Sequence, residues 1–145
     1  MNSLARLSLL GILLATPLAV GCGDSGGGTP GPDPSFMAVA PCSMESSYTT
    51  TGTTITFPAA ATDFNYTPKC LKVTAGATVT FSGDFSSHPL NPSALRGTTT
   101  GNPIVVTNTG TSAPFTFPTA GFYAYFCQFH GADNGQFMDG VIWVK

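Results

Sequence analysis

Four side chains in the second half of the chain could together bind a transition metal. Cys127 and His130 lie three residues apart at the end of an aromatic segment, and Met138 follows eight residues after the histidine. His88 lies well upstream, so it would have to reach the others through the fold. A thiolate, two imidazoles and a weak axial thioether are the donor set of trigonal copper sites that transfer electrons. The pattern therefore predicts one copper ion, with Met138 as the axial ligand and the other three residues in the plane.

Each of these residues, taken alone, has a simpler explanation. A histidine in a loop is usually a polar surface residue, and a methionine before a strand usually packs in the core. The chain has two histidines, and both lie where this donor set needs them, which favours the metal interpretation of the four together. Gln136 is the alternative to Met138, because an amide oxygen is the axial ligand in some copper sites.

Short segments rich in β-forming residues, bounded by Gly, Pro and Asn, must position these side chains. With a period of two, Tyr123, Tyr125 and Cys127 share one face of a strand, so the thiol is expected to point into the core. Many short strands at this spacing predict an all-β sandwich or barrel. One short helical turn is expected over 93–96. The expected strands are 49–57, 69–74, 77–82, 104–107, 113–117, 121–126 and 141–145.

The last third of the chain resembles the cupredoxin family, in particular the small blue copper proteins of the plastocyanin and azurin type. The resemblance rests on Cys-x-x-His after an aromatic strand at 125–130 and on Met-x-Gly before the last strand at 138–144. It extends more loosely back to Lys69, where a Lys-Val-x-x-Gly-x-x-Val-x-Phe pattern precedes the first histidine. The resemblance implies a Greek-key β-sandwich of about seven to eight strands. It also implies one type 1 copper that alternates between Cu(II) and Cu(I).

The segment departs from the family's pattern in three places: the Cys-to-Met loop is long, Pro89 follows the first histidine, and Phe129 stands where proline is common. Proline has no N–H, so one hydrogen bond to the cysteine sulfur is expected to be missing. The edge of His130, with an apolar rim of Pro89, Leu90, Phe129 and Ala132, is the expected contact for a transient redox partner.

The chemistry predicted for this chain is electron transfer without substrate turnover. Cys127 and His130 could form a nucleophile and base, but no third group evidently orients them. Two histidines are also too few for the additional copper centres of multicopper oxidases. The alternatives are a copper carrier in metal homeostasis that transfers no electrons, and a metal-free sandwich used for adhesion or as a scaffold.

The four cysteines divide among three expected roles. Cys22 ends a stretch of small residues that resembles the lipobox of bacterial lipoproteins, so it is the expected lipidation site. Cys127 is the metal ligand. Cys42 and Cys70 are then left, and in an exported protein they are expected to form a disulfide, a feature that is also similar to azurins. The alternative is a disulfide that includes Cys127 and leaves Cys42 or Cys70 free.

The first residues indicate export. Residues 1–21 carry Arg6 and then an apolar run that is short for a membrane span, which is typical of a signal peptide. An ordinary cleaved signal is the alternative to a lipoprotein signal. Residues 22–36 are expected to form a flexible Gly/Pro-rich tether, and residues 37–145 the cupredoxin domain. The expected product is a monomeric lipoprotein, anchored to a membrane in the periplasm or on the cell surface.

The charge balance argues against nucleic acid as a partner. The chain has five Lys and Arg residues against seven Asp and Glu, and Arg6 is lost with the signal, which leaves four against seven and a formal charge of −3. No basic patch is present in the sequence to neutralise phosphates.

Overall fold

The computed structural model describes residues 31–58 and 63–145. The predicted signal peptide, the predicted lipidation site Cys22 and most of the predicted tether lie outside the described residues. Within the described part of the chain, no helix is long and apolar enough to cross a membrane.

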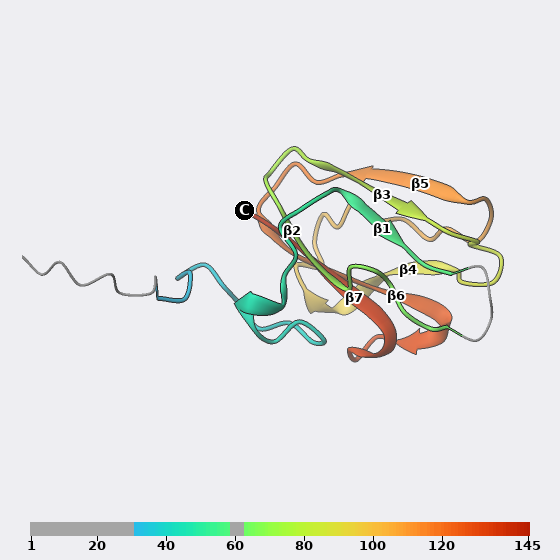
Figure 1. Ribbon diagram of the computed structural model, residues 1–145, viewed down its shortest axis with the longest axis horizontal. Coiled ribbons are helices and arrows are strands. Elements are labelled where there is room, and N and C mark those ends of the chain that lie inside the picture. The colour runs from blue at the N-terminus through green and yellow to red at the C-terminus, as the bar shows by residue number, and fades with distance from the viewer. Residues whose placement is uncertain (1–30, 59–62) are drawn as a thin grey trace, which may run out of the picture. The chain divides into compact units, whose positions relative to one another are not determined.

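Within the described residues, seven strands form two sheets that pack against each other (Figure 1). The three-stranded sheet has the order β1-β3-β5 and the four-stranded sheet has the order β2-β7-β6-β4. Strands β1 to β5 alternate between the sheets, and only the final hairpin β6–β7 stays within one. The prediction of an all-β sandwich is therefore confirmed. The strands are β1 (Thr54–Thr56), β2 (Cys70–Val73), β3 (Thr78–Ser82), β4 (Leu90–Gly97), β5 (Ser112–Thr116), β6 (Gly121–Ala132) and β7 (Gln136–Val144), and one 3-10 turn, η1, covers Glu45–Ser47.

The core lies between the sheets because alternate side chains of each strand point inward. On β6, Tyr123, Tyr125 and Cys127 are all buried in this core, as the period of two predicted. Phe122 and Ala124 of the same strand point to the other face of the four-stranded sheet, where they belong to a second cluster.

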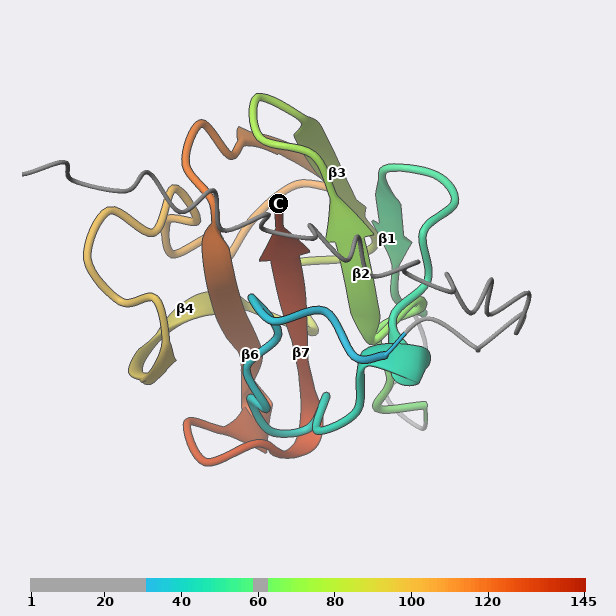
Figure 2. The same cartoon turned by 90° about the vertical axis from the view of Figure 1, so that its left-hand side faces the viewer.

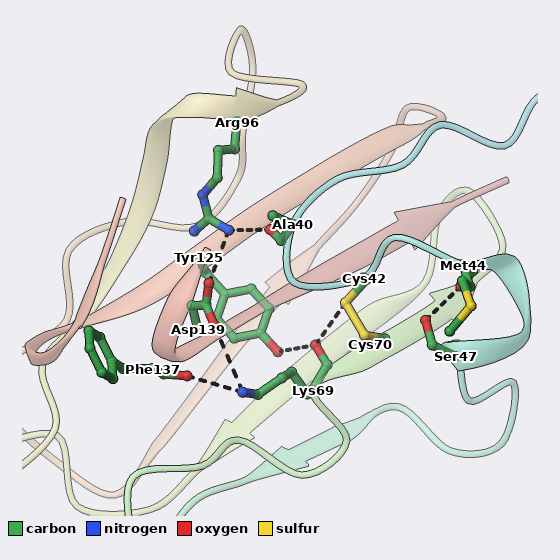
Figure 3. The surroundings of a disulfide bond; sticks show 10 residues. All are labelled: Ala40, Cys42, Met44, Ser47, Lys69, Cys70, Arg96, Tyr125, Phe137 and Asp139. Atoms are coloured by element: carbon green, nitrogen blue, oxygen red, sulfur yellow. Dashed lines mark hydrogen bonds and ion pairs between the residues drawn. A yellow bond between two sulfur atoms is a disulfide. The ribbon is translucent and has the colours of Figure 1, made fainter. Parts of the chain in front are cut away.

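This second, outer cluster is covered by the N-terminal segment. Figure 2 shows residues 31–48, in blue and teal, running across β6 and β7. Phe36, which the sequence placed at the end of the tether, packs edge-on against Tyr48 and Trp143 with ring centroids 6.2 and 5.5 Å apart. A disulfide between Cys42 and Cys70 joins the segment to the start of β2 (Figure 3). The predicted pairing of these two cysteines is thus present, and Cys127 is a free thiol.

Some predicted elements are wrong. Residues 93–96 lie in β4 and form no helical turn; the Ser93 hydroxyl accepts hydrogen bonds from the amides of Leu95 and Arg96, which produces a local irregularity in the strand. Residues 104–107 form no strand, because only Thr107 makes a bridge, to Leu90. The predicted strand 49–57 is reduced to Thr54–Thr56, whereas β6 and β7 are both longer than predicted.

Candidate metal centre

The predicted ligands Cys127 and His130 lie in a bulge of the β6–β7 hairpin. The ladder pairs Phe126 with Asp139 and next pairs Gly131 with Phe137. Four residues of β6, 127–130, therefore lie opposite a single residue of β7, Met138. Extra residues in one strand must leave the plane of the ladder, and they re-aim their side chains as they do so. The bulge thus brings a thiol, an imidazole and a thioether to one end of the hairpin.

Gly131 closes this bulge because it has no side chain. A Cβ atom at this position would overlap the carbonyl oxygen of Met138 and would lie 3.0 Å from the carbonyl oxygen of Cys127. The sequence indicated a long loop between the cysteine and the methionine, but β6 continues to Ala132 and β7 begins at Gln136, which leaves a short turn around Gly135, whose φ is +85°.

A tight turn before β4 presents His88. The Asp84 carboxylate accepts hydrogen bonds from the Ser86 amide at 2.9 Å and from the hydroxyls of Ser86 and Ser87 at 2.6 and 2.8 Å. The His88 amide donates to the Asp84 carbonyl oxygen at 3.0 Å. These side-chain hydrogen bonds hold the pKa of the Asp84 carboxyl below its usual range, because they favour the charged form. Sequence reasoning did not single out Asp84.

The register of β4 then brings His88 to the cysteine. Leu90 pairs with Cys127, and the Gln128 amide donates to the carbonyl oxygen of Pro89 at 2.8 Å. A residue some forty positions upstream is therefore held directly beside the bulge. This contact depends on strand order and could not be read from spacing along the chain.

The three donor atoms converge. The Cys127 sulfur lies 3.9 Å from Nδ1 of His88 and 3.6 Å from Nδ1 of His130, and the two nitrogens are 3.0 Å apart. The point equidistant from the corners of a triangle with these sides lies about 2.1 Å from each; zinc, the neighbouring ion in the row, binds imidazole nitrogen and thiolate sulfur at about 2.0–2.3 Å. The triangle therefore fits a first-row metal ion.

Burial makes the thiol an unfavourable place for a lone negative charge. Cys127 and His88 have no exposed surface, and His130 is half-buried. Burial raises the pKa of the Cys127 thiol, although hydrogen bonds from the backbone N–H groups of Phe129 and His130 oppose this rise. Pro89 has no N–H to donate to the sulfur. A thiolate at this position needs a positive charge beside it, which a bound cation supplies.

The two candidates for the axial position differ in their surroundings. Met138 is completely buried in the same core cluster as Cys127, and it lies opposite the bulge. Gln136 is exposed at the start of β7, next to the turn. Position and burial thus favour the thioether.

An aromatic side chain that sequence reasoning missed covers His130. The Phe64 ring stacks on the imidazole with centroids 4.3 Å apart and planes at 24°. Phe129, 63% exposed, meets the same ring edge-on at 6.3 Å. Two residues predicted on this rim, Pro89 and Leu90, are buried, so that part of the prediction is wrong. Phe64 comes from the segment between β1 and β2, where no motif marks it.

No protein-family model matches the sequence, and no curated protein matches it. Among solved structures, it is similar to a purple cupredoxin from Nitrosopumilus maritimus, with 22% identity over 65% of this chain and 100% of the other, at a TM-score of 0.46. It is similar to a mutant fern plastocyanin, with 19% identity over 63% of this chain and 99% of the other, at a TM-score of 0.44. It is also similar to a copper-containing nitrite reductase from Thermus scotoductus, with 22% identity over 66% of this chain and 22% of the other, at a TM-score of 0.44.

Proposed function

We propose that this domain binds a single type 1 copper ion and carries single electrons between redox partners. The observation that supports the proposal most directly is the triangle of donor atoms from Cys127, His88 and His130, which come from two distant parts of the chain. One soft sulfur and two imidazole nitrogens suit copper in the plane of the site, whereas the harder divalent ions prefer oxygen donors. Met138 would be the axial ligand.

When bound, copper would supply the one-electron couple between Cu(II) and Cu(I). The protein would keep the donor positions nearly the same in both states. Ladder pairs on each side of the bulge, Phe126 with Asp139 and Gly131 with Phe137, hold the ends of the segment that carries Cys127 and His130. A scaffold of this kind limits the rearrangement that accompanies electron transfer.

The arrangement favours a carrier over an enzyme. Cys127, His88 and Met138 are completely buried, so a substrate would find no open side among these donors. His130 is the donor nearest the surface, and the electron would enter and leave past its ring and the Phe64 ring stacked on it. Brief docking of a redox protein against this apolar end would be sufficient for transfer.

The N-terminal motif supports a proposal about where in the cell the protein acts. We propose export and attachment to a membrane through a lipid on Cys22, with the domain acting as a monomer. Mass spectrometry of the protein from a bacterial membrane fraction tests this proposal. A diacylated peptide beginning at Cys22 supports it, whereas a soluble, unmodified product contradicts it.

The copper proposal is tested by adding Cu(II) to the metal-free domain. We expect one equivalent to bind and to produce an intense visible absorption from sulfur-to-copper charge transfer. The band should be lost in Cys127→Ser and kept in Cys42→Ala/Cys70→Ala, which removes cysteines outside the site. A colourless protein would instead support a metal-free scaffold. A coloured protein that exchanges electrons slowly and delivers copper to an acceptor would support a copper carrier.

The axial ligand is tested with two variants of β7. Met138→Gln should change the visible spectrum and the reduction potential, because the axial donor tunes both. Gln136→Ala is the control and should change neither. The opposite result would assign the axial position to Gln136.

A further inference from the structure

A buried carboxylate lies directly beside the predicted axial ligand. Asp139 follows Met138 in β7, and successive residues of a strand point to opposite faces, so the two side chains lie on opposite sides of the sheet. Asp139 has no exposed surface. Its oxygens lie 3.2 Å from Nη1 of Arg96 and 3.9 Å from Nζ of Lys69 (Figure 3). A buried carboxylate is costly unless it is paired in this way, so the Asp139 side chain must stay close to these two cationic groups.

Lys69 contacts the residues on both sides of Met138. Its ammonium group faces Asp139 and also donates a hydrogen bond to the carbonyl oxygen of Phe137 at 3.0 Å. Phe137 has a φ of +68°, which non-glycine residues adopt only at an energetic cost. Its side chain is 73% exposed, so core packing of the ring does not explain the conformation. The bond from Lys69 is therefore a contact that can hold the backbone in this form.

Arg96 fixes the other side of Asp139. The same Nη1 atom donates to the carbonyl oxygen of Ala40, and Nε lies 3.4 Å from a carboxylate oxygen of Asp133 in the hairpin turn. Asp133 also accepts a hydrogen bond from the Ala94 amide at 2.9 Å. Through Arg96, β4, the N-terminal segment and the turn of the hairpin are all tied to the carboxylate next to Met138.

We propose that Lys69, Asp139 and Arg96 act as a clamp that sets the position of the Met138 sulfur beneath the three planar donors. This proposal rests on the proposed function of the site. Met138 faces the bulge, where the ladder is interrupted, so its backbone position is set by its two neighbours. An axial thioether binds copper weakly and cannot by itself impose that position. The three residues are positioning residues, because none of them offers a ligand to the donor triangle.

Loss of the clamp and loss of the Lys69 charge are expected to change the reduction potential in opposite directions. A sulfur lone pair stabilises Cu(II) more than Cu(I), so a thioether that moves away raises the reduction potential. Removal of a nearby positive charge relieves its repulsion of the copper ion, and Cu(II) gains more than Cu(I) because it carries the larger charge; this favours Cu(II) and lowers the potential. Lys69→Met would produce both changes. If the clamp positions the Met138 sulfur, the movement of the thioether has the larger effect and the potential rises.

Lys72, in β2, offers a matched control three residues after Lys69. It pairs with Glu45 at 3.3 Å and lies over the Trp143 ring at 3.8 Å, but it contacts neither neighbour of Met138. Lys72→Met therefore removes one positive charge and one ion pair without loosening the clamp. Lys69→Arg keeps the charge and a donor, and it should restore the wild-type behaviour.

The experiment measures the reduction potential of the copper-loaded domain and the methyl resonance of Met138 in the metal-free domain. We expect a higher potential in Lys69→Met, a lower or unchanged one in Lys72→Met, and a wild-type value in Lys69→Arg. We also expect the Met138 ¹³C-methyl signal to shift or broaden in Lys69→Met alone. A potential that falls equally in both methionine variants, or a Met138 signal unchanged in Lys69→Met, would overturn the clamp. A wild-type domain that shows no charge-transfer band would instead overturn the proposed function, while the methyl signal still tests the clamp.

Discussion

Removal of the disulfide should destabilise the domain by an amount that follows from its loop. Cys42 and Cys70 are separated by 28 positions in the sequence. In the chain-entropy model, a cross-link that closes a loop of this length lowers the entropy of the unfolded chain by about 12 cal/mol/K, which corresponds to about 3.6 kcal/mol at 25 °C. We therefore expect Cys42→Ala/Cys70→Ala to lower the free energy of unfolding of the metal-free domain by about 3–4 kcal/mol.

Urea unfolding followed by tryptophan fluorescence measures this loss directly. Trp143 is the single tryptophan of the chain, and it is 2% exposed in the outer cluster beside the disulfide. With a denaturant slope of about 1–3 kcal/mol/M, the midpoint should fall by about 1–4 M, and the slope itself should rise because the unfolded chain is more open. Wild-type protein in reductant is the comparison and should match the variant. A loss below about 1 kcal/mol with an unchanged slope would refute the loop-entropy reasoning.

Two further predictions concern the residues around the histidines. Phe64→Ala removes the ring stacked on His130, so the metal-free domain should lose about 1 kcal/mol of stability. The reduced, copper-loaded domain should react faster with a small soluble oxidant, as measured by stopped-flow absorption. An unchanged rate would show that Phe64 does not cover the path of the electron past His130. Asp84→Asn tests the turn before His88: because the folded-state pKa of Asp84 is lowered, its contribution to stability is present above the unfolded pKa of about 3.9 and is lost as the pH falls through the folded value. The difference between wild type and variant in urea midpoint should therefore shrink from pH 7 to pH 2, and a constant difference would contradict this reasoning.

Local patterns carried the prediction of the final hairpin. The alternation of Tyr123, Tyr125 and Cys127 predicted the inward face of β6, because the period of a strand is a property of the backbone itself. The Cys-x-x-His spacing likewise predicted two donors at one end of that strand. The disulfide followed from the number of cysteines and the expected export, and the structure contains it.

Predictions over other segments were wrong where side chains change the local backbone. Ser93 accepts bonds from two following amides, and this imitates a helical turn within an irregular strand. Residues 104–107 are rich in β-branched side chains, yet they find only one bridging partner, at Thr107, and form no strand. The β-strand propensity of a segment is not enough to form a strand where no neighbouring strand is available to pair with that segment.

By itself, the sequence determined that this is an all-β domain whose Cys127, His130 and Met138 are near each other along the chain, since these features depend on residue type and short-range spacing. The sequence also predicted His88 as a ligand from its residue type, but only the tertiary structure decided how it reaches the other two donors. The tertiary structure alone decided that Phe64 covers His130 and that the bulge opposite Met138 is flanked by contacts from Lys69 and Arg96. The physical reason is that these contacts join positions far apart in the sequence. Their partners are selected by strand order and register, which arise from packing of the whole sandwich and leave no periodic trace in any single segment.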